Sequence, residues 1–165
     1  MEFKDAQVMW FFNFRKGELM LSLVVIVIVS YIIGSIPTSI IAGRLIKGID
    51  IREHGSGNAG GTNVFRVLGP VPGILVMLFD AFKGFVATFW VSRIVIDPLP
   101  LDVGLIMILA GVGAIAGHIW TIFAGFRGGK GVGTAAGMLL ALFPKLCSSV
   151  LLFFLSSYFY QKLYH

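Results

Sequence analysis

The chain has 165 residues, of which 57% are hydrophobic, a formal net charge of +5 and a mean hydropathy of +0.92. Soluble domains contain only about 45–50% apolar residues, so this composition excludes an ordinary soluble protein and indicates an integral membrane protein. The positive charge then fits basic loops that face anionic headgroups and the cytoplasm, and no nucleic-acid partner is expected.

Residues 1–19 mix charges with aromatic side chains, and we interpret them as an N-terminal extension or an interfacial segment. The apolar run that follows is too long for a cleaved signal peptide, so a retained first span is expected from Met20 to Ala42. A second span is expected from Val71 to Ile96 and a third from Val103 to Phe126. Residues 20–165 are interpreted as a single membrane-embedded domain.

The last apolar stretch runs from Val132 to Tyr160 and contains Pro144 near its middle. This pattern is compatible with one long kinked helix or with two half-length helices that form a re-entrant hairpin. The predicted fold class is therefore all-α, a polytopic membrane bundle of about four to five spanning helices with two glycine-rich cytoplasmic loops.

Two glycine-rich polar runs, residues 54–63 and 126–134, interrupt the apolar sequence. Glycine lets backbone N–H groups converge on an anion, and the neighbouring basic side chains add charge, so each run is a candidate phosphate cradle. Basic residues gather beside both runs, whereas Arg93 is the only one near the loop between the second and third spans. The positive-inside rule therefore predicts that both runs face the cytoplasm.

The first span ends in Gly34-Ser35-Ile36-Pro37, where the proline is expected to kink the helix. The Ser35 hydroxyl either satisfies a backbone group that the proline frees or contacts a substrate. Arg44 is expected roughly 13 Å further along a continuous helix, near the headgroups. There its guanidinium can reach a lipid phosphate or clamp a bound one.

The first glycine-rich run has a high density of short hydrogen-bond donors. Its donors are Ser56, Asn58, Thr62 and Asn63, and Arg52 and Arg66 lie on either side. A solvated loop also needs glycine and asparagine, but this density beside two arginines favours phosphate binding.

Asp80, Lys83 and His118 are ionisable residues expected deep within the spans. Asp80 and Lys83 lie three positions apart on one helical face, where they form either a structural ion pair or part of a site. His118 is expected roughly 12 Å from the second glycine-rich run if the helix is unbroken. It is either a hydrogen-bonded packing residue or a proton acceptor for a substrate.

Several familiar catalytic motifs are absent from the sequence. Residues 128–134 do not form a Walker A loop, because Gly131 follows Lys130 where that motif has Ser or Thr. The sequence also lacks a metal-ligand cluster, a Gly-x-Ser-x-Gly elbow and a Cys–His pair. We therefore expect no metal, no other cofactor and no covalent acyl-enzyme, and a packing role for the single cysteine, Cys147.

Taken together, these residues resemble the bacterial acyl-phosphate:glycerol-3-phosphate acyltransferase family, PlsY. The match covers about Tyr31 to Gly137, and its ordered set is far more specific than any single motif. Its parts are Gly34-Ser35-Ile36-Pro37 with Arg44, Gly48-Ile49-Asp50-Ile51-Arg52, residues 55–63 with Arg66, Asp80-Ala81-Phe82-Lys83-Gly84, Gly117-His118, and residues 126–132.

The resemblance implies transfer of a fatty acyl group from acyl phosphate to glycerol 3-phosphate, which gives lysophosphatidic acid and inorganic phosphate in phospholipid biosynthesis. It implies a multi-pass protein of the bacterial inner membrane, with the lipid bilayer as partner and the active site facing the cytoplasm. Acyl phosphate is already activated for attack, so the protein has mainly to position a hydroxyl, bind two phosphates and stabilise developing charge.

The resemblance also implies roles for individual residues. His118, Lys130 and Ser35 would be catalytic; His118 would either deprotonate the attacking hydroxyl or orient it while a substrate phosphate takes the proton. The substrate and phosphate ligands would be Arg44, Ser56, Gly57, Asn58, Thr62, Asn63, Arg66, Lys83, Arg127, Gly128, Gly129 and Gly131.

The sequence departs from the family pattern in its C-terminal part. Family members generally continue with further membrane helices that carry polar active-site residues, whereas residues 151–160 are almost wholly apolar and aromatic. We therefore expect a member shortened at the C-terminus, either active or inactive. Gly133, where the family usually has alanine, is a smaller departure.

Two other classes of function remain open from the residues alone. A small transporter or channel for an anion would show inverted repeats that meet near the bilayer midplane. A purely structural bundle would use Gly111, Gly113 and Gly117 for close helix contact. The oligomeric state and the preferred acyl-chain length are left open.

Overall fold

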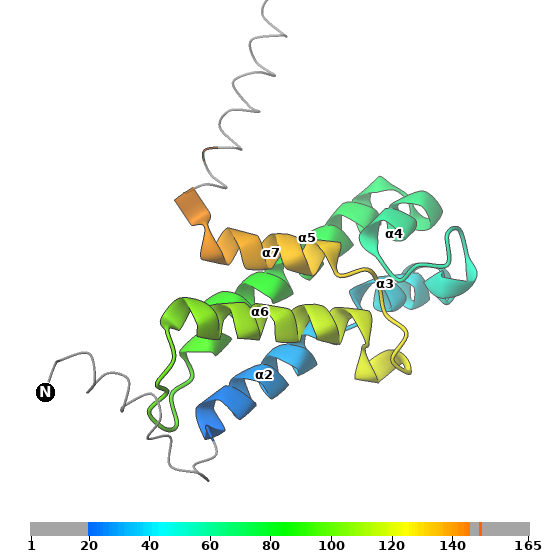
Figure 1. Cartoon of the computed structure of the whole chain (residues 1–165). Helices are drawn as coiled ribbons and strands as arrows, with labels where there is room; N and C mark the ends of the chain where they lie inside the picture. The colour runs from blue at the N-terminus through cyan, green and yellow to red at the C-terminus, as the bar shows by residue number, and fades with distance from the viewer. Residues whose placement is uncertain (1–19, 146–148, 150–165) are drawn as a thin grey trace, which may run out of the picture.

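The computed structural model describes residues 20–145 and 149, and every regular element in this part of the chain is a helix. The all-α prediction is thus confirmed. The helices are α2 (Leu21–Gly34), α3 (Thr38–Lys47), α4 (Gly61–Leu68), α5 (Pro70–Phe89), α6 (Val103–Ile119) and α7 (Val132–Leu142), with short 3₁₀ helices η1 (Ile51–Glu53), η2 (Val91–Arg93) and η3 (Ile122–Ala124). The helices α2, α5, α6 and α7 form the bundle, and α3 and α4 lie at one end of it (Figure 1).

Three stretches of the described chain are long and apolar enough to cross a membrane. They are Leu21–Lys47, Pro70–Arg93 and Val103–Ala124, and they correspond to the three predicted spans. The fourth apolar helix, α7, has only 11 residues and ends just before Phe143. The rest of the predicted last stretch, from residue 146 apart from residue 149, and the predicted extension at residues 1–19 lie outside the described residues.

The bundle buries its ionisable side chains beside an apolar core and exposes an apolar surface, as expected of a protein in lipid. Asp80, Lys83 and His118 are buried, whereas Leu78 and Phe79 of α5 are about 60% exposed. A charged side chain in a membrane helix faces the bundle interior because hydrocarbon cannot solvate it. The exposed apolar side chains therefore mark the surface that faces lipid.

Close helix contact depends on small residues. A Cβ atom on Gly117 of α6 would lie 2.1 Å from the Tyr31 carbonyl oxygen of α2, and one on Gly137 of α7 would lie 1.8 Å from the Ala81 carbonyl oxygen of α5. Without these side chains the backbones approach closely, which is how helices associate where no hydrophobic effect drives them together. The predicted role of Gly117 in close packing is confirmed, and it leaves room for a site elsewhere in the bundle.

The first span is interrupted where the proline predicted a kink. The helix α2 ends at Gly34 and α3 begins at Thr38, because Pro37 has no N–H to continue the hydrogen-bond ladder. The assumption of one continuous helix from Ser35 to Arg44 is therefore wrong. At the interruption the Ile36 carbonyl oxygen accepts the backbone N–H of Thr38 at 3.0 Å, and the carbonyl groups of Ser35 and Ile36 also accept hydrogen bonds from other elements.

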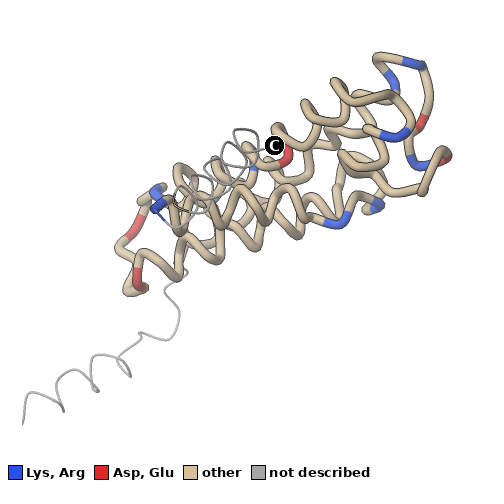
Figure 2. Tube along the Cα trace, turned by 90° about the horizontal axis from the view of Figure 1, so that it is seen from above, with Lys and Arg blue, Asp and Glu red and all other residues tan. Residues whose placement is uncertain are grey.

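Both glycine-rich runs lie at the same end of the bundle, the end that holds α3 and α4. Charged residues gather at the two ends in Figure 2, and most of the basic ones lie at this end. We call it the loop end; it is formed by residues 44–69 and 120–131. This placement does not fit the transporter alternative, which predicted repeats meeting near the middle of the bilayer.

Candidate active site

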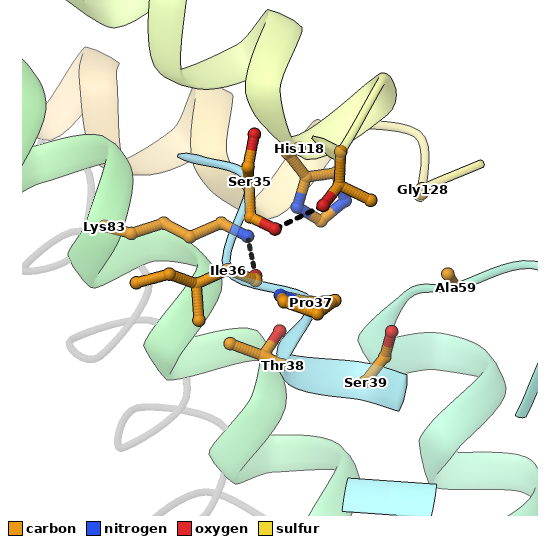
Figure 3. A pocket seen from close by; sticks show the side chains of 11 residues that line it. Ser35, Ile36, Pro37, Thr38, Ser39, Ala59, Lys83, His118 and Gly128 are labelled. Atoms are coloured by element: carbon orange, nitrogen blue, oxygen red, sulfur yellow. Dashed lines mark hydrogen bonds between the residues drawn. The ribbon is translucent and has the colours of Figure 1, made fainter. Parts of the chain in front are cut away.

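The interruption between α2 and α3 is held by α5 and by Thr121, which follows α6. Thr121 donates a hydrogen bond from its hydroxyl to the Ser35 carbonyl oxygen, and Lys83 donates from Nζ to the Ile36 carbonyl oxygen at 3.0 Å (Figure 3). Thr38, the first residue of α3, donates from its hydroxyl to Asp80 at 2.8 Å. The carbonyl groups of Ser35 and Ile36 at the interruption are thereby bonded to buried side chains, as a membrane interior requires.

Asp80 is the centre of a buried polar cluster. One of its oxygens, Oδ1, lies 2.8 Å from the Thr38 hydroxyl, 2.9 Å from Lys83 Nζ and 3.4 Å from His118 Nδ1. All three ionisable side chains are at most 7% exposed. The predicted Asp80–Lys83 ion pair is confirmed, and the structure adds His118 to it. Such a cluster is costly to bury, which points to a use beyond packing.

The second glycine-rich run folds back onto His118. The helix α6 ends at Ile119, after which the backbone N–H of Gly128 donates to the Ile119 carbonyl oxygen at 2.9 Å and that of Gly129 to the His118 carbonyl oxygen at 3.1 Å. The predicted separation of roughly 12 Å is therefore wrong, because the helix does not continue to Phe126. A Cβ on Gly128 would lie only 1.9 Å from the His118 carbonyl oxygen, so only glycine permits this approach.

A small pocket opens between the interrupted span, α5, the end of α6 and the folded-back run. Its volume is about 200 Å³, including space open to solvent. Figure 3 shows Lys83, His118 and the segment that contains Ser35 and Pro37 around it, from three different elements. The lining residues are Ser35, Ile36, Pro37, Thr38, Ser39, Ala59, Lys83, His118, Thr121, Gly128 and Gly129. Five predicted site residues therefore lie together beside the interruption at Pro37. They are Ser35, Lys83, His118, Gly128 and Gly129.

Two polar atoms beside this pocket have no hydrogen-bond partner within the described chain. They are the Ser35 hydroxyl, on a fully buried residue, and His118 Nδ1, which is near Asp80 but outside hydrogen-bond geometry. Buried polar atoms are nearly always paired in native proteins, so the Ser35 hydroxyl is a candidate substrate contact, whereas His118 Nδ1 faces the Asp80 carboxylate. The Nε2 atom of His118 lies against the backbone of Gly129, as a Cβ there would be 2.4 Å away.

Asn63 organises the first glycine-rich run. Its side-chain nitrogen donates to the carbonyl oxygens of Ile51 and His54, and its side-chain oxygen accepts from the backbone N–H of Ser56. The residue is 1% exposed. Its side chain is thus occupied by the loop itself, although the predicted role in binding substrate is not tested by this arrangement.

Most of the other predicted ligands lie outside the pocket, on the surface of the loop end. Asn58 and Gly131 are less accessible than the rest, and neither lines the pocket. The exposed residues are Arg44, Ser56, Gly57, Thr62, Arg66, Arg127 and Lys130. Their predicted roles in binding or catalysis remain predictions, and the structure gives them a common location around the pocket's end of the bundle.

Two residues of the site were not on the predicted list. Asp80 was noticed only as a partner for Lys83, and Thr121 gave no signal at all, because a threonine after an apolar helix is ordinary. Thr121 is 2% exposed and bonded to the carbonyl group of Ser35, which lies on a different helix. Only the three-dimensional arrangement reveals such a contact.

A carboxylate also anchors the segment that leads into the first glycine-rich run. The guanidinium of Arg52 hydrogen-bonds to Asp50 and lowers the pKa of that carboxyl from 3.8 to about 2. Asp50 also accepts the backbone N–H of Arg52 and so begins the short helix η1. The pair is therefore charged throughout the physiological pH range.

Comparison with known proteins identifies the group to which this arrangement belongs. The family model described as glycerol-3-phosphate acyltransferase matches residues 24–164. The chain belongs to this family. The match includes the interrupted span, both glycine-rich runs and the Asp80–Lys83–His118 cluster.

Curated members of the family are closely similar in sequence. The glycerol-3-phosphate acyltransferase of Chlorobium phaeobacteroides (strain BS1) is 52% identical over 150 residues, which are 87% of this chain and 63% of that protein. The one from Pelodictyon phaeoclathratiforme is 56% identical over 130 residues, 76% of this chain and 55% of that protein. The chain therefore spans a little over half the length of these relatives.

Two crystal structures of a family member are also similar. Both are of PlsY (YgiH), an integral membrane glycerol 3-phosphate acyltransferase. Its glycerol 3-phosphate form shares 35% identity and a TM-score of 0.64, over 84% of this chain and 66% of that one. Its lysophosphatidic acid form is 37% identical, with the same TM-score, over 79% of this chain and 62% of that one. At this identity and TM-score the likeness extends beyond an all-helical composition to the arrangement of the helices.

Proposed function

We propose that this chain, with residues 20–165 as one membrane-embedded domain, transfers a fatty acyl group from acyl phosphate to glycerol 3-phosphate. The products are lysophosphatidic acid and inorganic phosphate. The observation that carries the proposal is the buried Asp80–Lys83–His118 cluster beside a pocket lined by Ser35 and two glycines, in a chain that belongs to the glycerol-3-phosphate acyltransferase family. The names of the relatives support the acceptor and the product; the acyl phosphate donor rests on the family resemblance.

The chemistry requires little of the protein beyond positioning and charge. The acceptor hydroxyl attacks the acyl carbonyl carbon, a new C–O ester bond forms, and the bond from that carbon to the phosphate oxygen breaks. His118 is the proposed acceptor of the hydroxyl proton, and Asp80, 3.4 Å from its Nδ1, orients the ring and stabilises its charged form. Phosphate is a good leaving group, so no nucleophilic side chain is needed.

The loop end supplies groups that suit two phosphates. We propose that Arg44, Arg66, Arg127 and Lys130 bind and neutralise the phosphates, together with backbone and side-chain donors of both glycine-rich runs. Lys130 and Ser35 are proposed as catalytic residues, Lys130 by stabilising developing charge and Ser35 through its unpaired hydroxyl. The remaining proposed ligands are Ser56, Gly57, Asn58, Thr62, Asn63, Lys83, Gly128, Gly129 and Gly131.

The proposed setting is the bacterial inner membrane, with the loop end in the cytoplasm. The concentration of basic residues there supports this orientation through the positive-inside rule. The acyl chain would then lie along the apolar helices, where each buried CH₂ group contributes roughly 0.8 kcal/mol. The donor reaches the site from the bilayer and the acceptor from the cytoplasm.

The test is acyl transfer to labelled glycerol 3-phosphate by membranes that contain this chain. Acyl phosphate and acyl-CoA are offered in parallel, and Lys130→Ala is compared with Lys145→Ala, which removes an exposed lysine outside the loop end. We expect product from acyl phosphate alone, lost in Lys130→Ala and kept in Lys145→Ala. Product from neither donor, with the chain present in the membrane, would contradict the proposal.

A further inference from the structure

The side chain of Arg52 bridges the two glycine-rich loops. Its Nε and Nη2 atoms hydrogen-bond to the carboxylate of Asp50, at 3.0 Å to Oδ1 and 2.6 Å to Oδ2. Its Nη1 donates to the carbonyl oxygens of Ala124 at 2.9 Å and of Arg127 at 3.2 Å. The Asp50 carboxylate binds one edge of the planar guanidinium. The orientation of the opposite edge, which carries Nη1, is therefore fixed.

The backbone of residues 50–52, from which the Arg52 side chain extends, is held by buried contacts. Ile51 is fully buried beside Arg52, and its carbonyl oxygen accepts a hydrogen bond from the side chain of Asn63 at 3.0 Å. Asp50 begins η1 by accepting the backbone N–H of Arg52. The guanidinium therefore projects from a segment held by a buried side chain, a buried amide and a cap.

The receiving segment has a backbone that needs support. Gly125 and Phe126 both adopt left-handed conformations, with φ of 66° and 59°. Phe126 is not glycine, so its Cβ makes this conformation unfavourable. The two carbonyl groups that Arg52 holds belong to Ala124 and Arg127, the residues on either side of this turn. Arg52 thus holds the turn in which the chain reverses towards the pocket.

The segment after this turn carries the proposed site. Gly128 and Gly129 line the pocket against His118, and the exposed Arg127 and Lys130 adjoin them. From this we infer that Arg52 is a positioning residue for the proposed acyl transfer: it holds residues 124–130 beside His118 and the first glycine-rich run without touching substrate. The inference rests on the proposed function. Four of the five guanidinium N–H groups already have protein partners, one on Nε, two on Nη1 and one on Nη2, so the side chain is committed mainly to the protein.

The kinetic test compares Arg52→Gln and Arg52→Lys with Arg93→Gln, which removes an exposed arginine from the opposite end of the bundle. If Arg52 only stabilised the fold, its loss would lower the amount of active protein and leave KM unchanged. Misplacement of a phosphate-binding segment instead raises KM. We expect Arg52→Gln to raise KM for at least one phosphate substrate about tenfold or more, the usual effect of losing charge-assisted hydrogen bonds.

Arg52→Lys and Arg93→Gln serve as comparisons for Arg52→Gln. Arg52→Lys keeps the positive charge but cannot contact the carboxylate and both carbonyl groups at once, so an intermediate KM is expected. Arg93→Gln should leave KM unchanged. Unchanged KM for both substrates in Arg52→Gln would overturn the inference.

A second measurement does not depend on catalysis. A nitroxide attached at Phe126→Cys, in a Cys147→Ser background, reports the mobility of the turn by electron paramagnetic resonance. Arg52→Gln should increase mobility at this position and leave a label at Val95→Cys, in the loop between η2 and α6, unchanged. An unchanged spectrum at position 126 would show that Arg52 does not hold the turn, and would overturn the inference. If the unaltered chain transferred no acyl group, the proposed function would fail while this spectrum still decided whether Arg52 holds the turn.

Discussion

The Nδ1 atom of His118 lies 3.4 Å from Oδ1 of Asp80, on neighbouring helices of a bundle whose outer surface is apolar. The same carboxylate oxygen contacts Lys83, so a single negative charge serves two potential cations in a buried site. This sharing gives Asp80 a larger structural effect than either partner. It also makes the consequences of replacing His118 and Asp80 different in kind.

Replacing the histidine should remove catalysis without removing the fold. His118→Gln keeps a polar side chain of similar size but cannot accept a proton, so we expect acyl transfer to fall by about 10²–10⁴-fold. The control is His54→Gln, an exposed histidine whose Nδ1 contacts the Asp50 carbonyl oxygen. That variant should retain activity. Activity of His118→Gln close to that of the unaltered chain would remove His118 as the proton acceptor.

Replacing the aspartate should destabilise the protein. Asp80→Asn leaves the buried Lys83 ammonium without its charge partner, and breaking a buried ion pair typically costs about 3–5 kcal/mol. Thermal unfolding in detergent measures the effect. The double variant Asp80→Asn/Lys83→Met should recover part of the loss because no unpaired charge remains. A double variant no more stable than Asp80→Asn would argue against the ion pair as the cause.

The backbone approach at Gly128 should be intolerant of a methyl group. Gly128→Ala would place Cβ 1.9 Å from the His118 carbonyl oxygen, so the segment must move away from the pocket. A displacement of about 1 Å at a site can cost 10²-fold in rate, and we expect a loss of this order. In Gly104→Ala, the matched control, the new Cβ meets only the end of the Asp102 side chain at 2.9 Å. Equal activities of the two variants would contradict the tight approach.

The sequence predicted those features of the site that depend on local spacing. Asp80 and Lys83 are three positions apart on a helix, so their pairing follows from helical geometry alone. The common location of the two glycine-rich runs followed from counting basic residues along the loops. In both cases, the relevant residues are close in the sequence or belong to one pattern.

The position of the second run relative to His118 could not be predicted in this way. It depends on where α6 ends and on two left-handed residues, Gly125 and Phe126, neither of which forms a recognisable turn motif. The contact between Thr121 and the Ser35 carbonyl group joins different helices. Such long-range contacts arise from packing, so a single sequence carries no pattern for them.

The Asp50–Arg52 pair predicts a loss of stability in acid. The folded-state pKa of Asp50 is about 2, below its ordinary value of 3.8, so the pair stabilises the fold fully above about pH 4 and less as the pH falls towards 2. The unaltered protein should therefore melt at a lower temperature at pH 3 than at pH 6. Asp50→Asn should show a smaller difference. Hydrogen bonds from Ser22 also lower the pKa of Asp97, so some acid sensitivity should persist. An identical difference in both proteins would contradict the prediction.

The orientation in the membrane can be tested with introduced thiols in a Cys147→Ser background. The structure guides the choice of positions: Ala59, although in a glycine-rich run, is only 4% exposed, so a thiol there would be protected on either side of the membrane. Glu53 is exposed at the loop end, and Val95, at the opposite end, is 77% exposed.

If the loop end is cytoplasmic, an impermeant maleimide should label Val95→Cys in intact cells and Glu53→Cys only after permeabilisation. Both thiols should react equally in detergent, which controls for accessibility within the fold. The reverse pattern in intact cells would place the proposed site on the outer face, away from the cytoplasm that supplies glycerol 3-phosphate, and would contradict the proposed function as well as the topology.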